Sequence, residues 1–479
     1  MFKPNLTFLN ASRSLSILPS NMIPKRGLMR AVNKLTLICV LQVLVSTIGY
    51  GQGEYFSRAE VLEDFEYFKE KLLQKHPGVG LYKSLDEFNS FFEHLEVADS
   101  VSTLDLYGVF SDVHQVILDG HTQVYQEYFL QWENEHSGLY IPFQPYWDGQ
   151  KLYLFKAYSY QSMDWIGQEI VSINGVESKK LIEGMLARMP RDGYQSGYAI
   201  WELNTYFYEH YSWFFGCFDD YSVVLKHDAA TDTVDMKGIL FDELLDEIEA
   251  AEPFKKSLTL QLNKEKTTAL LTIKSWTNYY LSKEHKQKLI RELREATKEI
   301  ERNDIAHLII DIRDNPGGRL KFSEYLLSYL LDEPFLMNEG FKRKKDGVVV
   351  DARGEKMGLR KPKRKTFKGD VYVLINEGCF SNSSIFSATL QRYDRAIFIG
   401  EETGGSQYSM CGHPFFYMLP NTGISVSIPT LQMILKPTGE DIPHGVLPDY
   451  EVRPSFSNLV NGEDVALNKA MELISGSKP

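Results

Sequence analysis

The sequence is poor in cysteine and lacks an apolar run long enough to cross a membrane comfortably. Four cysteines among 479 residues are too few for the disulfide framework that stabilises small secreted domains. The apolar run at residues 35–50 is shorter than the roughly 20 residues of a transmembrane helix. The hydrophobic content of 43% and the charged content of 24% are typical of a folded protein with two or three domains.

The first 51 residues lack acidic side chains, and the rest of the chain lacks a basic excess. Residues 1–51 hold six Lys or Arg. Arg30 and Lys34 precede the apolar run and small residues precede Gln52, as in a secretory signal peptide that starts at Met29. The remaining chain carries 46 basic and 64 acidic side chains, a formal charge of −18, which disfavours nucleic acid or anionic lipid as a partner. We therefore expect an exported protein, periplasmic or extracellular, without stable membrane insertion after signal removal.

Three cysteines follow the apolar run, which itself contains Cys39. They are Cys217, Cys379 and Cys411. A single disulfide bond between Cys379 and Cys411 is one interpretation, and three buried thiols are the other. The sequence leaves both open.

The segment at residues 52–120 has the apolar spacing of helices. Apolar side chains recur at helical intervals in the stretches 56–73, 88–95 and 106–117, which predicts a helical N-terminal domain. A turn that carries His121 follows this domain. A histidine at a turn is ordinarily a surface residue, so the turn alone does not indicate catalysis.

Residues 121–250 combine strand patterns with a stretch rich in aromatic residues. Strand-like runs, the tight turn Asn174-Gly175 and a helix follow one another between residues 152 and 189. Residues 166–175 resemble the late strands of a PDZ domain, a module that binds peptide C-termini by adding a strand to a sheet edge. A working peptide clamp and a purely structural β-module both stay open. We interpret the aromatic residues between 194 and 218 as domain packing.

Residues 251–479 alternate strand and helix patterns, which predicts an α/β domain. Its loops at residues 315–318 and 378–381 each follow an apolar strand and precede a helix. We expect their backbone N–H groups to meet at the carboxyl edge of the sheet, where α/β proteins place their sites. Strands are expected at 257–262, 268–273, 306–313, 371–375 and 396–399, and helices at 284–301, at 320–331 and after residue 381.

Ser381, Ser383 and Ser384 stand where the last of these helices begins. A serine there lies near unpaired backbone N–H groups, which suits either an N-cap or a nucleophile whose oxyanion those groups stabilise. Serine is common at N-caps, so this segment by itself favours the cap.

Four motifs in this order resemble those of the carboxyl-terminal-processing (tail-specific) and tricorn-type serine peptidase family. The resemblance covers most of the chain after residue 51 and is closer to the histidine-using, tricorn-like branch. It implies a mixed α/β multidomain protein with a helical N-terminal domain, a PDZ-like β-module and a crotonase-like α/β catalytic domain. The motifs are Leu308-Ile309-Ile310-Asp311-Ile312-Arg313-Asp314-Asn315-Pro316-Gly317-Gly318, Val373-Leu374-Ile375-Asn376-Glu377-Gly378-Cys379-Phe380-Ser381, Ile399-Gly400-Glu401-Glu402-Thr403-Gly404-Gly405 and Gly445-Val446-Leu447-Pro448-Asp449.

The resemblance implies a role for each residue that matches the family motifs. Ser381 becomes the nucleophile, and the backbone N–H groups of Asn382 and of Gly317 or Gly318 form the oxyanion hole. Ser384 stands where many members have glutamate. The tail-specific branch has a lysine base on the loop that here carries Ser406, so this chain lacks that base.

A histidine base replaces the lysine in the tricorn-like branch, and the segment Asp119-Gly120-His121-Thr122 resembles its source. The resemblance therefore implies His121 as the general base. A third, acidic group should orient the imidazole ring. Glu440 lies in the comparable region, with Asp441 and Glu402 as further candidates.

Residues 341–368 hold twelve Lys or Arg against three acidic residues. We predict a solvated loop for this basic run. A mobile lid that favours acidic peptides or C-terminal carboxylates is a weaker hypothesis.

The sequence thus predicts an exported serine endopeptidase that acts on peptides or unfolded proteins through an acyl-enzyme. No metal or organic cofactor is implied, because the histidines lack metal-ligand spacing. Two alternatives keep the same fold without the chemistry: a peptide-binding protein, and a carrier for apolar ligands. Oligomeric state stays open.

Overall fold

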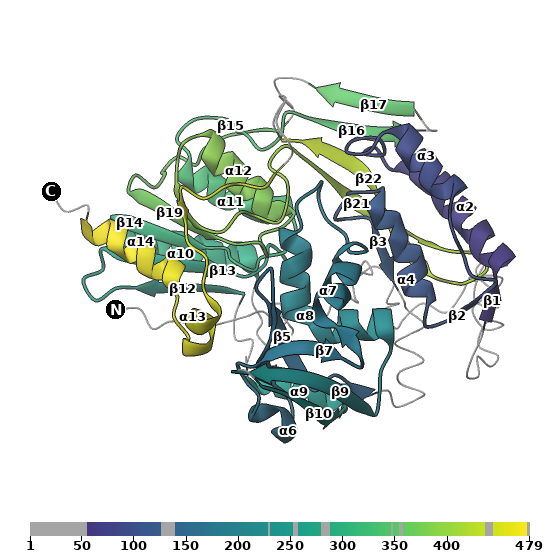
Figure 1. Ribbon diagram of the computed structural model, residues 1–479. Helices are drawn as coiled ribbons and strands as arrows, with labels where there is room; N and C mark the ends of the chain where they lie inside the picture. Colours follow the sequence, from purple (N-terminus) through teal and green to yellow (C-terminus); the bar gives the residue numbers. More distant parts are fainter. Residues whose placement is uncertain are drawn as a thin grey trace, which may run out of the picture.

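The computed structural model describes residues 55–125, 139–228, 230–251, 257–278, 288–345, 348–353, 358–435 and 444–476. The predicted signal peptide, Glu284 at the start of one predicted helix, Glu440 and Asp441 lie outside these residues. Within them, no helix combines the length and apolarity that a membrane crossing requires. Figure 1 shows three regions around helix α8: N-terminal helices, a middle sheet, and an α/β region that ends near the C-terminus.

The N-terminal region is helical, as predicted. Its first two helices begin at serine caps, because Ser57 and Ser84 each form a reciprocal capping box with the glutamate three residues on. Their apolar faces share one core with Val426 and Ile428 of the distant strand β22. These helices therefore pack against the C-terminal half of the chain. The elements are β1 (Tyr55–Ser57), α2 (Arg58–Lys75), α3 (Leu85–Glu93), β2 (Ser100–Ser102), α4 (Leu106–Ser111) and the 3-10 helix η2 (Asp112–Gln115).

The middle region is a six-stranded sheet in the order β10-β9-β7-β6-β5, with β8 paired to β7. Buried aromatic side chains of α8 pack against it, including Phe207 and Tyr208, which agrees with the predicted packing role. The PDZ resemblance stays a prediction. The elements are β4 (Leu139–Tyr140), β5 (Phe143–Trp147), β6 (Leu152–Ala157), α6 (Tyr160–Met163), β7 (Glu169–Ile173), β8 (Val176–Glu177), α7 (Ser178–Leu186), α8 (Gly197–Phe215), β9 (Asp220–His227), β10 (Ala230–Lys237), β11 (Ile239–Leu240) and α9 (Phe241–Ala251).

The α/β region contains a six-stranded sheet in the order β12-β13-β14-β19-β20-β23. All neighbours run parallel except β12 and β13. Its strands are β12 (Leu258–Leu262), β13 (Thr268–Ile273), β14 (His307–Asp311), β19 (Asp370–Ile375), β20 (Ile397–Gly400) and β23 (Tyr450–Glu451). Its helices are α10 (Leu289–Arg302), α11 (Leu320–Leu330), α12 (Asn382–Arg392), α13 (Phe456–Asn461) and α14 (Val465–Gly476).

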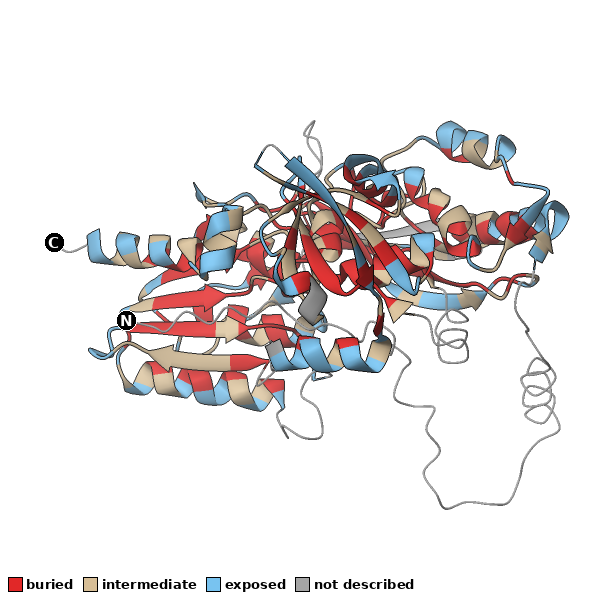
Figure 2. Ribbon diagram, turned by 60° about the horizontal axis from the view of Figure 1, so that its bottom comes forward, coloured by how far each residue is buried: buried red, intermediate tan, exposed pale blue. Residues whose placement is uncertain are grey.

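Helices cover both faces of this sheet, which explains its continuous apolar strands. Leu308 and Ile310 belong to the core formed with α10, α11 and α12, whereas Ile309 between them packs with Leu467 of α14. Figure 2 shows buried residues along the strands beside the C-terminal helix and exposed residues on the outer sides of the helices. The predicted strands and the helix at 320–331 are confirmed within one or two residues.

A third sheet, in the order β17-β16-β22-β21, joins the N-terminal helices to the α/β region. The prediction of a solvated loop at residues 341–368 is wrong for its first half, where β16 and β17 form an antiparallel pair. Lys344 of β16 donates from Nζ to the carbonyl oxygen of Leu73 at 2.9 Å, which ties this strand to the end of α2. The strands of this sheet are β3 (Gln123–Tyr125), β16 (Gly340–Lys345), β17 (Val348–Arg353), β21 (Ser409–Met418) and β22 (Ser425–Ile434). The short strands β15 (Phe335–Leu336) and β18 (Leu359–Arg360) form a separate antiparallel pair.

Strand β3 also pairs with β22. Because β3 begins two residues after His121, this pairing carries the histidine turn to the α/β region. The suggested bridge between Cys379 and Cys411 is not formed, since both are buried thiols.

Candidate active site

Ser381 lies at the sharp turn between β19 and α12. Its backbone has φ 54° and ψ −120°, and its side chain makes no capping hydrogen bond to the helix. The N-cap interpretation is therefore wrong. A positive φ is strained for any residue with a Cβ atom, and such a strand-to-helix turn projects a serine hydroxyl out of the backbone.

The loop after β14 holds this strained turn in place. The backbone N–H of Phe380 donates to the carbonyl oxygen of Asn315 at 3.1 Å. The Asn376 side chain pairs with the loop twice, because its Oδ1 accepts from Asp314 N at 2.8 Å and its Nδ2 donates to Asp314 Oδ1 at 2.7 Å. The two loops predicted to meet at the carboxyl edge of the sheet are thus joined directly.

His121 contacts the serine hydroxyl. Its Nε2 lies 3.1 Å from Oγ of Ser381, across 260 residues of sequence. Two backbone bonds hold the histidine: its N–H donates to Asp119 Oδ1 at 3.0 Å, and its carbonyl oxygen accepts from Ser427 Oγ at 2.9 Å. Burial lowers the pKa of His121, against the opposing charge of Asp119. The imidazole is therefore held neutral beside the hydroxyl.

The acidic third group predicted for His121 is not among the described side chains. Nδ1 of His121 is buried and has no hydrogen-bond partner among the described residues. Glu402 contacts other groups, since its Oε1 accepts from Gly445 N at 2.6 Å and lies 3.9 Å from Nδ1 of His444. Glu440 and Asp441 fall outside the described residues, so their role stays a prediction.

Asp119 supports the histidine turn, a role that the sequence interpretation missed although Asp119 lies in the same motif. Its Oδ1 accepts from the backbone N–H groups of His121 and Thr122 at 3.0 and 2.8 Å. Burial opposes ionisation of this carboxyl, yet neighbouring His76 and His121 lower its pKa well below the usual range. An ionised carboxylate accepts these N–H bonds more strongly than a neutral one.

A second buried carboxyl, Asp192, joins the histidine turn to the loop where the tail-specific branch has its lysine. Its two oxygens accept from Gly120 N at 2.9 Å and from Ser406 N at 3.3 Å. Burial and the charge of Asp119 raise the pKa of Asp192 to about 7. No sequence pattern around residue 192 signals this contact.

His76, Asp119 and Cys411 form a buried group whose ligand atoms lie within 4.8 Å of one another, the spacing of a metal site. The hydrogen bonds do not fit an ion. Gly78 N–H donates to Nδ1 of His76 at 2.9 Å, so this nitrogen carries no proton and its lone pair is already used, while Nε2 faces Asp119 at 3.6 Å. Burial also raises the pKa of the Cys411 thiol. We therefore interpret His76 and Cys411 as side chains that pack beside Asp119, and not as ligands of a metal ion.

Glycine at position 317 allows the two loops to approach. A Cβ atom there would lie 2.7 Å from Cβ of Ser381 and 2.8 Å from the nitrogen of Asn382. The N–H of Gly317 is already bonded to Asn315 Oδ1 at 2.9 Å. Gly318 forms a parallel bridge with Trp276. The two hydrogen bonds of this bridge are made by the neighbouring atoms, Gly317 O and Arg319 N, and not by Gly318 itself.

An aromatic stack connects the site to α8. The ring of His121 stacks on Phe380 with centroids 4.9 Å apart, Phe380 stacks on Tyr198 at 4.1 Å, and Tyr198 stacks on Trp201 at 5.5 Å. Trp201 Nε1 then donates to Asp314 Oδ1 at 3.0 Å. The stack therefore returns to the loop that holds the serine turn.

Comparison with known families and sequences finds similarity to serine peptidases. The model of peptidase family S41 matches residues 267–452. A carboxyl-terminal-processing protease of Synechocystis sp. is 25% identical over 190 residues, which cover 39% of this chain and 41% of that protein. A probable CtpA-like serine protease of Staphylococcus aureus is 26% identical over 188 residues, 36% of this chain and 35% of that protein. The matched part is thus less than half of each relative. These matches confirm the family resemblance.

Solved structures are similar over a larger part of the chain. Mature CPAF complexed with lactacystin has a TM-score of 0.63 and 15% identity, and it covers 87% of this chain and 98% of that one. Another structure of mature CPAF has a TM-score of 0.61 and 16% identity, covering 87% and 97%. At this identity the likeness supports the fold alone, and it confirms the mixed α/β multidomain architecture.

Proposed function

We propose, from the premise that residues 267–452 belong to peptidase family S41, that this chain is a serine endopeptidase that hydrolyses peptide bonds through an acyl-enzyme. The observation that carries the proposal is the 3.1 Å contact between Nε2 of His121 and Oγ of Ser381. A nucleophile and a base within hydrogen-bonding reach are the first requirement of this chemistry. The same contact weighs against the two non-catalytic alternatives, which do not need it.

The reaction follows from the positions of these two side chains. Nε2 of His121 takes the proton of the Ser381 hydroxyl as Oγ bonds to the peptide carbonyl carbon, and the carbonyl electron pair moves to oxygen. The intermediate collapses when the C–N bond breaks and the imidazolium gives its proton to the leaving amine. Water, deprotonated by the same imidazole, then attacks the acyl carbon, and the ester C–O bond breaks as the imidazolium returns its proton to Oγ of Ser381.

Gly318 and Asn382 are our candidates for the oxyanion hole. Asn382 is the first residue of α12, so its N–H has no partner within the helix. At Gly318 the parallel bridge uses the neighbouring Gly317 O and Arg319 N, which turns the Gly318 N–H away from Trp276. Gly317 is the weaker candidate because its N–H is bonded to Asn315. For the open Nδ1 of His121, Glu440 remains our candidate acid, with Asp441 beside it.

The substrate class and location are also part of the proposal. We infer peptides or unfolded proteins as substrates, which would reach the protein outside the cytoplasm if residues 1–51 act as a signal peptide. Support comes from the family match and from the basic n-region and apolar run of residues 30–50.

A fluorophosphonate tests the nucleophile directly. We expect the purified protein to gain the mass of a single adduct, mapped to Ser381, because the neutral imidazole activates that hydroxyl. The Ser381→Ala variant should gain none. Absence of an adduct on the folded wild-type protein, together with no hydrolysis of unfolded casein, would overturn the proposal in favour of a binding role.

The pH profile tests the base. Burial lowers the pKa of His121, with His76 and His413 acting in the same direction and Asp119 against it. A lowered pKa keeps the ring neutral, and able to accept a proton, to lower pH than an ordinary histidine. We therefore expect the acidic limb of kcat/KM to have its midpoint below about 6.5, the usual histidine value. A midpoint above that value would contradict the assignment.

A further inference from the structure

A separate cavity of about 150 Å³ lies between the middle sheet and the α/β region. On the same measure one water molecule needs about 10–15 Å³, so the cavity admits an organic ligand. It is lined at the carboxyl ends of β13, β14, β19, β20 and β23, the edge at which open α/β sheets bind ligands. Ser381 and His121 are not among its lining residues.

The walls of the cavity carry an excess of negative charge. Six carboxylates and three cationic side chains line it. Arg453 is shared by two of the carboxylates, at 2.9 Å from Glu377 Oε1 and 3.1 Å from Glu401 Oε1. Lys274 lies 3.4 Å from Asp314 Oδ2, and Arg313 is paired with Asp464 and with Asp311 behind it. No lining cation of the described chain is thus left over to balance the excess.

Burial is the main cause of three raised pKa values at the cavity, and the charges of neighbouring carboxylates add to those of Glu401 and Tyr146. Burial, and then the charge of Glu377, raises the pKa of Glu401 to about 7. Burial also raises the pKa of Glu377. Across the cavity, burial and the charges of Glu401 and Glu377 raise the pKa of Tyr146. A bound cation would relieve this repulsion.

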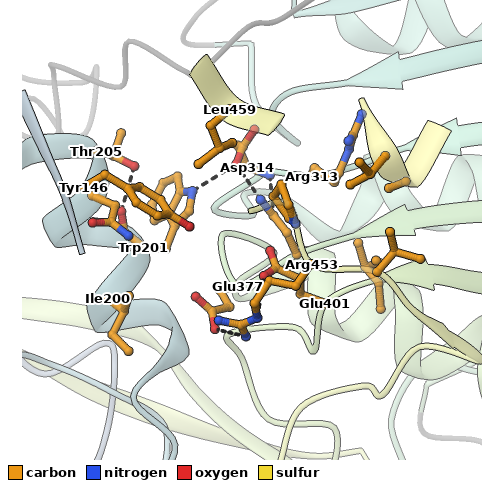
Figure 3. Close-up of a pocket in the computed structure, with 18 of the residues that line it drawn as sticks. Tyr146, Ile200, Trp201, Thr205, Arg313, Asp314, Glu377, Glu401, Arg453 and Leu459 are labelled. Atoms are coloured by element: carbon orange, nitrogen blue, oxygen red, sulfur yellow. Dashed lines mark hydrogen bonds and ion pairs between the residues drawn. The ribbon is translucent and has the colours of Figure 1, made fainter. Parts of the chain in front are cut away.

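The opposite wall presents Tyr146, Trp201 and Ile200 beside the polar residues Asp148, Asn204 and Thr205. Figure 3 shows Tyr146, Trp201 and Ile200 on the side of the middle sheet and α8, facing Arg453, Glu377 and Glu401. The Trp201 Nε1–H is bonded to Asp314, so the indole has no further donor for an anion. Aromatic faces attract cations, above all when water is excluded.

We propose that this cavity is a binding site for an organic cation, a guanidinium or primary ammonium group on a short aliphatic chain. The cation lies against Glu401 and Glu377, and the aliphatic part contacts Ile200 and the aromatic wall. The free small molecule and the basic side chain of a peptide offer the same chemistry. Because the cavity is bordered by both the middle sheet and the α/β sheet, the ligand bridges these two regions.

Isothermal titration with butylguanidinium at pH 8, where Glu401 is ionised, tests the site. We expect saturable binding of one ligand per chain, and no binding of butyrate or of uncharged butylurea. The isosteric variant Glu401→Gln should weaken binding at least tenfold. Glu265→Gln serves as the matched control, because exposed Glu265 lies in the turn before β13, at the other edge of the sheet.

The remaining outcomes decide against the site or define its ligand. Equal affinities of Glu401→Gln and Glu265→Gln, or no saturable binding up to about 10 mM, would overturn it. Ser381→Ala should bind butylguanidinium like the wild type, so the result is independent of the proposed hydrolysis. In a parallel titration, a blocked Gly-Gly-Arg-Gly-Gly peptide that binds at least as tightly identifies a peptide side chain as the ligand; weaker binding identifies a free small cation.

Discussion

The Ser381→Gly variant is expected to lose peptide hydrolysis by at least about 10⁴-fold and to become more stable than the wild type. Removal of a catalytic serine costs this much or more in well-studied serine peptidases. The gain in stability has a separate cause. Ser381 has φ 54° and ψ −120°, a conformation that glycine adopts without steric cost. Strain at such a position costs about 1–3 kcal/mol, and glycine offsets part of the gain by about 0.5–1 kcal/mol of backbone entropy.

We therefore expect the free energy of unfolding to rise by about 1 kcal/mol, measured by urea denaturation beside hydrolysis of fluorescent casein. Ser381→Ala is the matched control, because it removes the same hydroxyl but keeps a Cβ atom. It should be as inactive as the glycine variant without gaining its stability. Retained hydrolysis would exclude Ser381 as the nucleophile. Equal stabilities of the two variants would show that the turn stores no strain.

His121→Ala is expected to lower kcat by at least about 10³-fold, because the serine proton then has no acceptor among the described side chains. The loss should be chemical, with the fold intact. The two hydrogen bonds that hold residue 121, to Asp119 and from Ser427, use its backbone, so alanine keeps them. Reaction with the fluorophosphonate should slow by a similar factor.

The control for this variant is His94→Ala, which alters an exposed histidine at the end of α3. Its activity should match that of the wild type. The residual activity of His121→Ala should also lack the acidic limb of the pH profile, a change that a merely structural defect would not produce. Activity of His121→Ala within tenfold of the wild type would mean that another group accepts the proton.

Much of the secondary structure could be predicted from sequence, because a strand or a turn depends mainly on residues that are neighbours along the chain. The apolar runs at residues 306–313 and 371–375 predicted buried strands, and the structure has β14 and β19 there. The loops at residues 315–318 and 378–381 were predicted to meet at the carboxyl edge of the sheet, and the serine turn does pack against Gly317. For the two strands, the residues that carry the apolar pattern are the residues that form the strand.

Some local predictions failed because distant contacts decide them. Serine at a helix start favoured an N-cap, but the bonds from Asn315 and Asn376 hold the turn in a conformation that directs the hydroxyl away. The basic run was predicted as a loop, yet pairing with β22 makes β16 a strand. Propensity is a weak guide when a partner strand supplies the hydrogen bonds.

By itself the sequence determined the central strands and helices of the α/β region and the Gly-Gly loop between β14 and α11, whereas Ser381 was identified as the nucleophile by the family resemblance. The family resemblance added His121, but only the tertiary structure decided that it reaches Ser381, through the pairing of β3 with β22. Only the fold could likewise reveal Asp192, the aromatic stack and the cation cavity. The physical reason is that each of these depends on side chains that are far apart in sequence, whose meeting is decided by sheet pairing and core packing rather than by local pattern.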